Sequence, residues 1–300
     1  MKLLSQFSEV RAHQPWPVTA RDVIRRTALD MFGLFDSEAH LDRPRVHLLY
    51  LHHVLADEEQ PFRALLKWLS ERHTFISYSD AVRRLRGELP IDRPYIAFSF
   101  DDGLRNALRA AELLAEAGAS ACYFVCSSMA VPRSDEDVRE FCANELHLPP
   151  AEFLSFDDME TLLRGGHEIG NHSSAHRTLA TLSGAQLEDD VAGSLAELRR
   201  HLGNGIEHFA WPRGLFHHFS APAAAAVFRA GHTSCASAER GAHIAPTAAP
   251  HELCIRRDQV IAAWPLRHTR HFLVKASKSA SAANNMWPDG WLPQIEGALR

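Results

Sequence analysis

The stretch Ala97-Phe98-Ser99-Phe100-Asp101-Asp102-Gly103 is the most informative part of this 300-residue chain. An apolar run from Tyr95 to Phe100 ends in two carboxylates and a glycine, and a helical pattern of apolar residues follows from Leu104 to Ala115. A strand that ends in acids and turns into a helix places both carboxylates at the carboxyl edge of a parallel sheet, where α/β enzymes keep their catalytic groups. Taken alone, the stretch fits a strand followed by an aspartate helix cap equally well.

Two histidines four residues apart follow a second strand-like run. His172 and His176 come directly after the run from His167 to Gly170. One helical turn sets both imidazoles on the same side. With Asp102 they form a set that suits a divalent ion, most of all Zn²⁺, with Co²⁺, Ni²⁺ and Mn²⁺ as alternatives. Asp101, next to this set, remains available to handle a proton.

Three segments in order resemble the motifs of the polysaccharide deacetylase family, also called the NodB-homology domain or carbohydrate esterase family 4. They are Ser99-Phe-Asp-Asp-Gly103, the His172 to His176 segment, and Phe209-Ala-Trp-Pro-Arg-Gly214. The segment from Leu48 to Val54 is similar to the opening of the exopolysaccharide-deacetylase branch. The resemblance covers about residues 45 to 260, and it implies an α/β fold in the form of a distorted seven-stranded (β/α) barrel.

The same resemblance implies roles for individual residues. Asp102, His172 and His176 would hold the metal, Asp101 would be the general base, and the backbone N–H of Arg213 would stabilise the oxyanion. The chain departs from the family at Ala210, where many members have an arginine, and at Arg213, where the family has a tyrosine. In the absence of that arginine, Arg256 or Arg257, at the end of a later strand, is expected to orient Asp101.

A proton donor for the leaving amine is expected at the end of the first strand. Tyr50-Leu51-His52-His53-Val54 closes that run, and successive strand residues face opposite sides. His52 is expected to face the site and donate the proton, with His53 as a neutral neighbour and the alkaline limb of the pH profile depending on His52. His268, in the only match to the late histidine motif of the family, is interpreted as a helix-surface residue.

The resulting functional hypothesis is a metal-dependent hydrolase that removes an N-acetyl group from an N-acetylated sugar in an oligosaccharide, a glycan or a glycolipid precursor. The alternatives are a deformylase or small-molecule amide hydrolase on the same barrel, and a catalytically silent barrel that binds glycans. Separate candidates for the base and the metal ligands favour an enzyme, since a binding protein needs no base.

The composition of the chain indicates its partners and its compartment. The net charge of −5 argues against a nucleic-acid partner. Five cysteines without CxxC spacing suit a reducing compartment, where they pack rather than pair. The chain shows no apolar signal region and no run of eighteen apolar residues, so we expect a cytoplasmic protein without a transmembrane segment. The oligomeric state is left open.

The expected organisation is an N-terminal extension (1–44, punctuated by Pro15 and Pro17), a barrel (45–275) with an insertion at 127–150, and a C-terminal tail (276–300). The low-complexity stretch from Lys275 to Asn285 is expected to be mobile, and Trp287 and Trp291 after it are expected to dock back on the body. Helix caps are predicted at the serines Ser79, Ser155 and Ser183. The acidic pairs Asp157-Asp158 and Asp189-Asp190 are interpreted as helix-start or solvated acids without a catalytic role.

Overall fold

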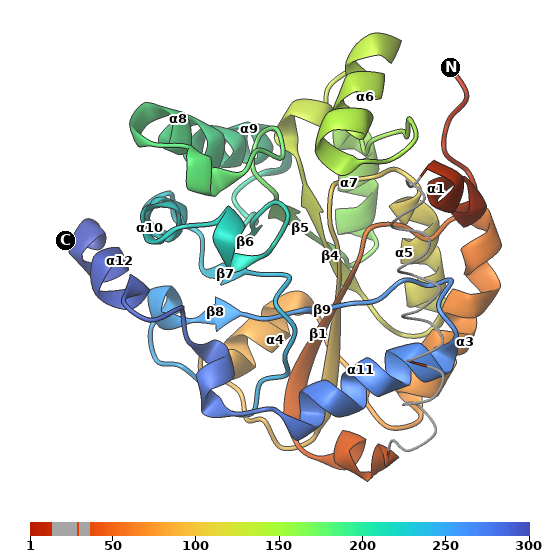
Figure 1. Ribbon diagram of the computed structural model, residues 1–300, viewed down its shortest axis with the longest axis vertical. Coiled ribbons are helices and arrows are strands. Elements are labelled where there is room, and N and C mark those ends of the chain that lie inside the picture. The colour runs from red at the N-terminus through yellow and green to blue at the C-terminus, as the bar shows by residue number, and fades with distance from the viewer. Residues whose placement is uncertain (14–28, 30–36) are drawn as a thin grey trace.

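The computed structural model describes residues 1–13, 29 and 37–300; the rest of the expected extension, Pro15 and Pro17 included, lies outside the described residues. Nine strands form one sheet in the order β8-β7-β6-β5-β4-β3-β1-β9, with β2 paired to β3 (Figure 1). All pairings between strands are parallel. The strands are β1 (Arg45–Leu51), β2 (Thr74–Phe75), β3 (Pro94–Phe100), β4 (Ala121–Val125), β5 (Glu168–Asn171), β6 (His208–Ala210), β7 (Ser234–Ala236), β8 (Cys254–Ile255) and β9 (Asp258–Gln259).

The sheet curls into the expected distorted α/β barrel. Among the described residues it has nine strands rather than the expected seven, and three of them, β2, β8 and β9, are only two residues long. Its two ends, β8 and β9, are joined only by Arg256 and Arg257. β8 pairs with β7, and β9 pairs with β1. This short segment therefore connects the two ends of the sheet.

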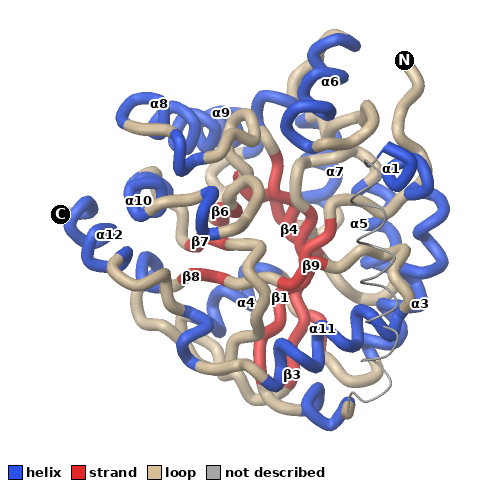
Figure 2. The backbone as a smooth tube through the Cα atoms, viewed as in Figure 1, coloured by secondary structure: helices blue, strands red, loops and turns tan. Residues whose placement is uncertain are grey.

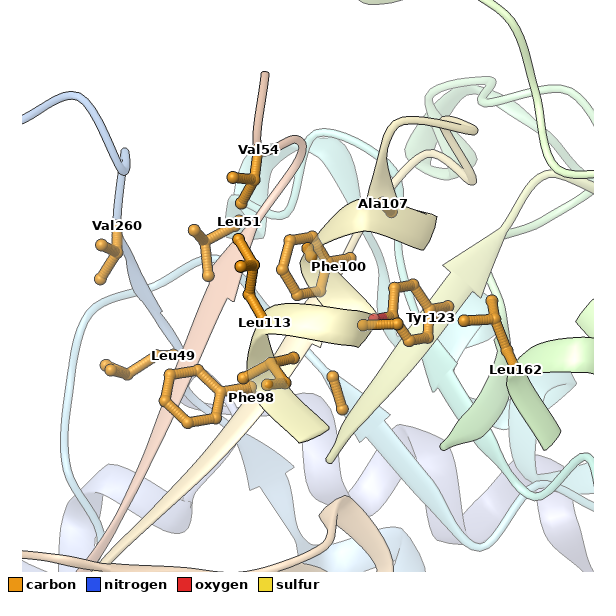
Figure 3. Packing of buried hydrophobic residues seen from close by; sticks show 14 of the residues in the cluster. Leu49, Leu51, Val54, Phe98, Phe100, Ala107, Leu113, Tyr123, Leu162 and Val260 are labelled. Atoms are coloured by element: carbon orange, nitrogen blue, oxygen red, sulfur yellow. The ribbon is translucent and has the colours of Figure 1, made fainter. Parts of the chain in front are cut away.

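Each long strand is buried on both faces, as parallel strands between helices and a packed interior require. In β3, Ile96, Phe98 and Phe100 belong to the core under the helices, whereas Tyr95 and Ala97 face the barrel interior. Figure 3 shows the outer layer, where Phe98, Phe100 and Tyr123 meet residues of the covering helices such as Leu113. The two-residue alternation puts Asp101 on the interior side, at the carboxyl end of β3.

Helices cover the outside of the sheet (Figure 2). The described helices are α1 (Phe7–His13), α3 (Glu59–Ser70), α4 (Tyr78–Leu85), α5 (Ala107–Glu116), α6 (Asp135–Phe141), α7 (Phe156–Arg164), α8 (Gly184–Glu188), α9 (Ser194–Leu202), α10 (Ala221–Arg229), α11 (Leu266–Lys278) and α12 (Trp291–Leu299). α4 is the exception, because its Tyr78, Ala81, Val82 and Leu85 pack with interior residues of the strands. The helix thereby closes the interior away from the carboxyl edge.

The helix caps predicted from the sequence are confirmed only in part. Ser155 caps α7 in the predicted capping box with Asp158. Ser77 caps α4 in place of Ser79, and the Ser183 side chain makes no cap hydrogen bond. In α5, Leu108 is half-buried and Ala115 is exposed, because the helix begins at Ala107 and Leu104 lies before it.

The C-terminal residues correct one expectation. They form α11 and α12, and the expected boundary at residue 275 falls inside α11. Trp287 docks as predicted, with ring centroids 6.0 Å from Trp211 and 6.2 Å from Phe219. The stretch from residue 275 to 285, which was expected to be mobile, forms the end of α11 and a 3₁₀ turn, and its Asn285 is buried and hydrogen-bonded to His243. Among the described residues, no helix has the length and apolar character needed to cross a membrane.

Candidate active site

One cavity of about 340 Å³ lies at the carboxyl edge of the sheet and gathers most of the predicted site. Its lining includes His52 after β1, Asp101 and Asp102 after β3, His172 and His176 after β5, and Arg213 after β6. These segments are far apart in the sequence, and the parallel strands bring their carboxyl ends together.

Asp102, His172 and His176 form a compact ligand set, with one donor atom of each within 4.8 Å of the others. Asp102 Oδ1 lies 3.4 Å from His172 Nε2 and 3.3 Å from His176 Nε2. Ligands of a tetrahedral zinc site at roughly 2.0–2.2 Å from the ion are about 3.3–3.6 Å apart. The three residues therefore fit a divalent metal ion.

The hydrogen bonds around the set leave its ligand atoms available. The Nδ1 of His172 lies 2.7 Å from the Ala210 carbonyl oxygen, which can only accept, so the Nε2 lone pair faces Asp102. Asp102 Oδ1 is buried and has no hydrogen-bond partner among the described residues. A buried carboxylate oxygen without a donor is costly, and a bound cation would satisfy it.

The electrostatics of the set also favour positive charge. Burial disfavours the charged ring of His172, but Asp102 and Asp101 outweigh it and raise the pKa of this histidine. Burial likewise opposes ionisation of Asp102, yet the neighbouring imidazoles of His172 and His176 lower the pKa of its carboxyl well below the usual range.

Asp101 is held by Arg257, as one of the two sequence alternatives stated. The guanidinium donates to both carboxylate oxygens, at 2.7 Å and 2.9 Å, and both side chains are buried. Further bonds to Ser99 Oγ and the Ser237 carbonyl fix the guanidinium. Arg256 points elsewhere and donates to the Asn284 carbonyl. Burial opposes the charge of Arg257, but Asp101 outweighs it and raises the pKa of the guanidinium, so Asp101 faces a permanent cation.

The third motif forms a tight turn beside the cavity. Arg213 has a left-handed φ of 63°, and a Cβ on Gly214 would lie 2.2 Å from the Ala238 Cβ, so only glycine fits there. The Arg213 side chain forms an ion pair, at 3.0 Å, with Glu145 in the segment 127–150, the insertion expected from the sequence. Within the described part of the chain, the Arg213 N–H donates to no protein acceptor.

Backbone strain concentrates around this cavity. The described residues other than glycine with positive φ are Asp102, His147, Ser173, His176 and Arg213. All except Ser173 line the cavity. Such conformations cost about 1–3 kcal/mol each and persist where the surrounding structure holds them, most often at functional sites.

The positions of His52, His53 and His268 differ in part from the sequence expectation. His52 lines the cavity as expected, but burial outweighs Asp102 and Asp101 and lowers its pKa. His53 also lines the cavity and bonds to Glu58 through Nδ1 at 2.7 Å. His268 is not a helix-surface residue: it is 1% exposed in the first turn of α11 and lines the same cavity. That interpretation used a helical pattern with Ile261 and Trp264, but α11 begins only at Leu266, so the spacing to these two residues does not indicate the face of His268.

Asp190 is a residue whose importance the sequence interpretation missed. It is completely buried rather than solvated, and it accepts hydrogen bonds from the Ser174 N–H at 3.0 Å and Arg177 Nε at 2.7 Å. Both donors belong to the segment around His172 and His176. Its position beside Val191 and one turn after Leu187, on a buried helical stripe, was the available signal.

Asp190→Ala is expected to weaken metal binding about 10–100-fold, the usual effect of losing a residue that holds a ligand segment in place. Titration of the metal-free protein with Zn²⁺ in a calorimeter measures this affinity. The exposed neighbour Asp189 provides the matched control, because Asp189→Ala leaves both hydrogen bonds intact. Equal affinities in Asp190→Ala and the wild type would contradict the role.

Comparison with known proteins agrees with this geometry. The family model for polysaccharide deacetylase matches residues 89–233, a range that contains Asp101, Asp102, His172, His176 and Arg213. Residues 89–233 of the chain belong to the polysaccharide deacetylase family. A comparison with curated protein sequences found no match.

Solved structures share the fold of this family member at low sequence identity. IcaB from Ammonifex degensii superposes with a TM-score of 0.61 at 18% identity, over 80% of this chain and 100% of that one. A de-N-acetylase from Aggregatibacter actinomycetemcomitans gives 0.61 at 15% identity, over 76% and 99%. The BpsB deacetylase domain from Bordetella bronchiseptica gives 0.59 at 18% identity, over 75% and 97%. The barrel architecture expected from the sequence is thereby confirmed.

Proposed function

We propose that this chain is a metal-dependent hydrolase that removes the N-acetyl group from an N-acetylated sugar in a glycan or glycan precursor. The observation that carries the proposal is the pairing of two buried carboxylates with different partners. Asp102 lies against two imidazoles, and Asp101 lies against the guanidinium of Arg257. One carboxylate is thus equipped to bind a metal and the other to accept a proton. IcaB, BpsB and the de-N-acetylase share the barrel, and two of them are described as deacetylases.

A divalent metal ion held by Asp102, His172 and His176 would polarise the amide carbonyl and acidify a water molecule. Asp101 is not a member of this trio and would take the proton of the attacking water. Arg257 orients Asp101 through its two hydrogen bonds. Asp101 and Asp102 are adjacent in the sequence but have different tasks. They can have different partners because Asp102 adopts a left-handed φ of 75° after the extended strand.

The oxyanion of the tetrahedral intermediate would receive a hydrogen bond from the backbone N–H of Arg213. This donor is held in a rigid turn by the close contact of Gly214 with Ala238. Preorganised donors of this kind stabilise developing charge without reorganisation during the reaction. Zn²⁺ is the metal that the His/His/Asp set favours most.

The leaving amine needs a proton, and we propose His52 as its donor. His52→Ala is expected to reduce kcat about a hundredfold or more, the scale of losing a general acid, while metal content stays intact. Steady-state kinetics combined with elemental analysis tests this. His217→Ala, at an exposed histidine outside the cavity lining, serves as the control.

His268 is the competing donor, because it is buried and lines the same cavity. A variant His268→Ala with strongly reduced kcat, together with near-normal kcat in His52→Ala, would transfer the role to His268.

A panel of N-acylated sugars and small amides, assayed for release of the free amine and run alongside elemental analysis, tests the function as a whole. Acetate release from an N-acetylated sugar by metal-loaded protein supports the proposal. Faster release of formate would instead favour a deformylase, and turnover of small non-sugar amides alone would favour a small-molecule hydrolase. Glycan binding without any turnover would identify a silent barrel. The cytoplasmic location remains a prediction that cell fractionation tests.

A further inference from the structure

The cavity is lined by the reacting groups and by apolar side chains, which we call the apolar wall. These apolar residues come mostly from outside the strand ends. They are Phe7 and Val10 of α1, Leu146 and Leu148 of the insertion, and Trp264 before α11. Residues of the expected N-terminal extension therefore belong to the candidate active site.

The N-terminal part of this wall is held in place by specific contacts. The Phe7 N–H donates to Asp57 Oδ1 at 2.7 Å, and the Ala56 N–H donates to the Ser5 carbonyl at 3.2 Å. The Phe7 ring centroid lies 5.9 Å from that of His53. These contacts fix α1 on the loop that follows β1, beside His52.

The same segment is joined to the insertion. The Leu4 N–H donates to the Pro150 carbonyl at 2.7 Å, and Leu4 packs in one cluster with Leu146 and Leu148. Across the cavity, the insertion is tied to the third motif by the Glu145–Arg213 ion pair. The apolar wall is therefore a built part of the fold that extends from α1 through the insertion to the catalytic turn.

The size of the cavity limits what it takes. Its volume of about 340 Å³ is near the lower end of the roughly 300–1,000 Å³ usual for small-molecule sites, which suits one sugar ring with a short substituent.

We propose that the substrate is a single N-acetylated sugar joined to an apolar group, rather than an inner residue of a long polymer. The acetamido group would lie over Asp101 and the metal ligands, and the apolar group would lie against α1 and the insertion. An apolar group would gain by burial against Phe7, Val10 and Leu146, whereas a hydrated sugar chain would gain less there. The inference rests on the proposed deacetylase function.

The test compares kcat/KM of the full-length metal-loaded protein for three compounds: the methyl glycoside of N-acetylglucosamine, its octyl glycoside, and an N-acetylglucosamine pentasaccharide. The octyl glycoside is expected to exceed the methyl glycoside at least tenfold, since burial of two methylene groups already has an effect of about that size. The pentasaccharide is expected to be the poorer substrate of the two larger compounds. A nitrophenyl glycoside distinguishes an aromatic from an alkyl group.

A substitution in the apolar wall tests whether the wall causes the preference for the octyl glycoside. Val10→Ser should bring the octyl-to-methyl ratio toward one, whereas Val131→Ser, at a half-buried valine outside the cavity, should keep the wild-type ratio. A preference for the pentasaccharide, or a ratio that Val10→Ser does not change, would overturn the inference and leave the deacetylase function standing. Acetate release from none of the compounds would overturn the proposed function, and the inference with it.

Discussion

Asp101→Asn is expected to abolish turnover while the metal content stays at the wild-type level. The amide has nearly the shape of the carboxylate and can still accept a hydrogen bond from Arg257, but it cannot take a proton from water. Loss of a general base costs about 10²–10⁴-fold in rate. Single-turnover and steady-state assays of acetate release, together with elemental analysis of the same preparation, measure both quantities.

The neighbouring carboxylate provides the contrast. Asp102→Ala removes a ligand atom of the trio, so this variant should lose metal as well as activity. The two variants therefore separate by metal content even though both are inactive. Metal loss in Asp101→Asn, combined with surviving activity in Asp102→Ala, would reverse the two roles.

The second large effect concerns the histidines of the trio. One divalent ion per chain is expected in the wild type, and His172→Ala or His176→Ala should lower the occupancy sharply, because a site with two remaining protein ligands binds zinc much more weakly. Elemental analysis after dialysis against a metal-buffered solution measures the occupancy directly, without reference to activity.

His217 supplies a matched control for this measurement. It is an exposed histidine outside the cavity lining, so His217→Ala should keep the full metal content. Unchanged occupancy in both His172→Ala and His176→Ala would remove these residues from the metal site.

Local sequence was sufficient for the strands and for the residues that follow them. The apolar run from Tyr95 to Phe100 predicted β3 within one residue of its observed bounds, because burial on both faces leaves an uninterrupted apolar pattern. The same logic placed Asp101, Asp102 and His172 at one edge, since parallel strands end together. The capping box of Ser155 with Asp158 was also readable, because both partners lie within one helical turn.

Helix phase and burial were less readable from local patterns. The start of α11 at Leu266 put His268 into the cavity, and the burial of Asp190 turned an apparent surface acid into a support for the histidine segment. The spacing of residues fixes which side chains share a face of a helix, but the packing of the helix on the body decides which face is buried.

By itself the sequence determined the α/β class, the order of strand and helix, and the identity of the two carboxylates and two histidines at the strand ends, because these depend on contacts within a few residues and on parallel pairing. Only the tertiary structure decided between Arg256 and Arg257, and only it joined α1 and the insertion into the apolar wall of the cavity. Arg257 meets Asp101 across 156 residues of sequence, at the point where one short segment spans the two ends of the sheet. Such a contact depends on how the sheet curls, which is set by the packing of the whole barrel and leaves no mark in the local pattern of residues.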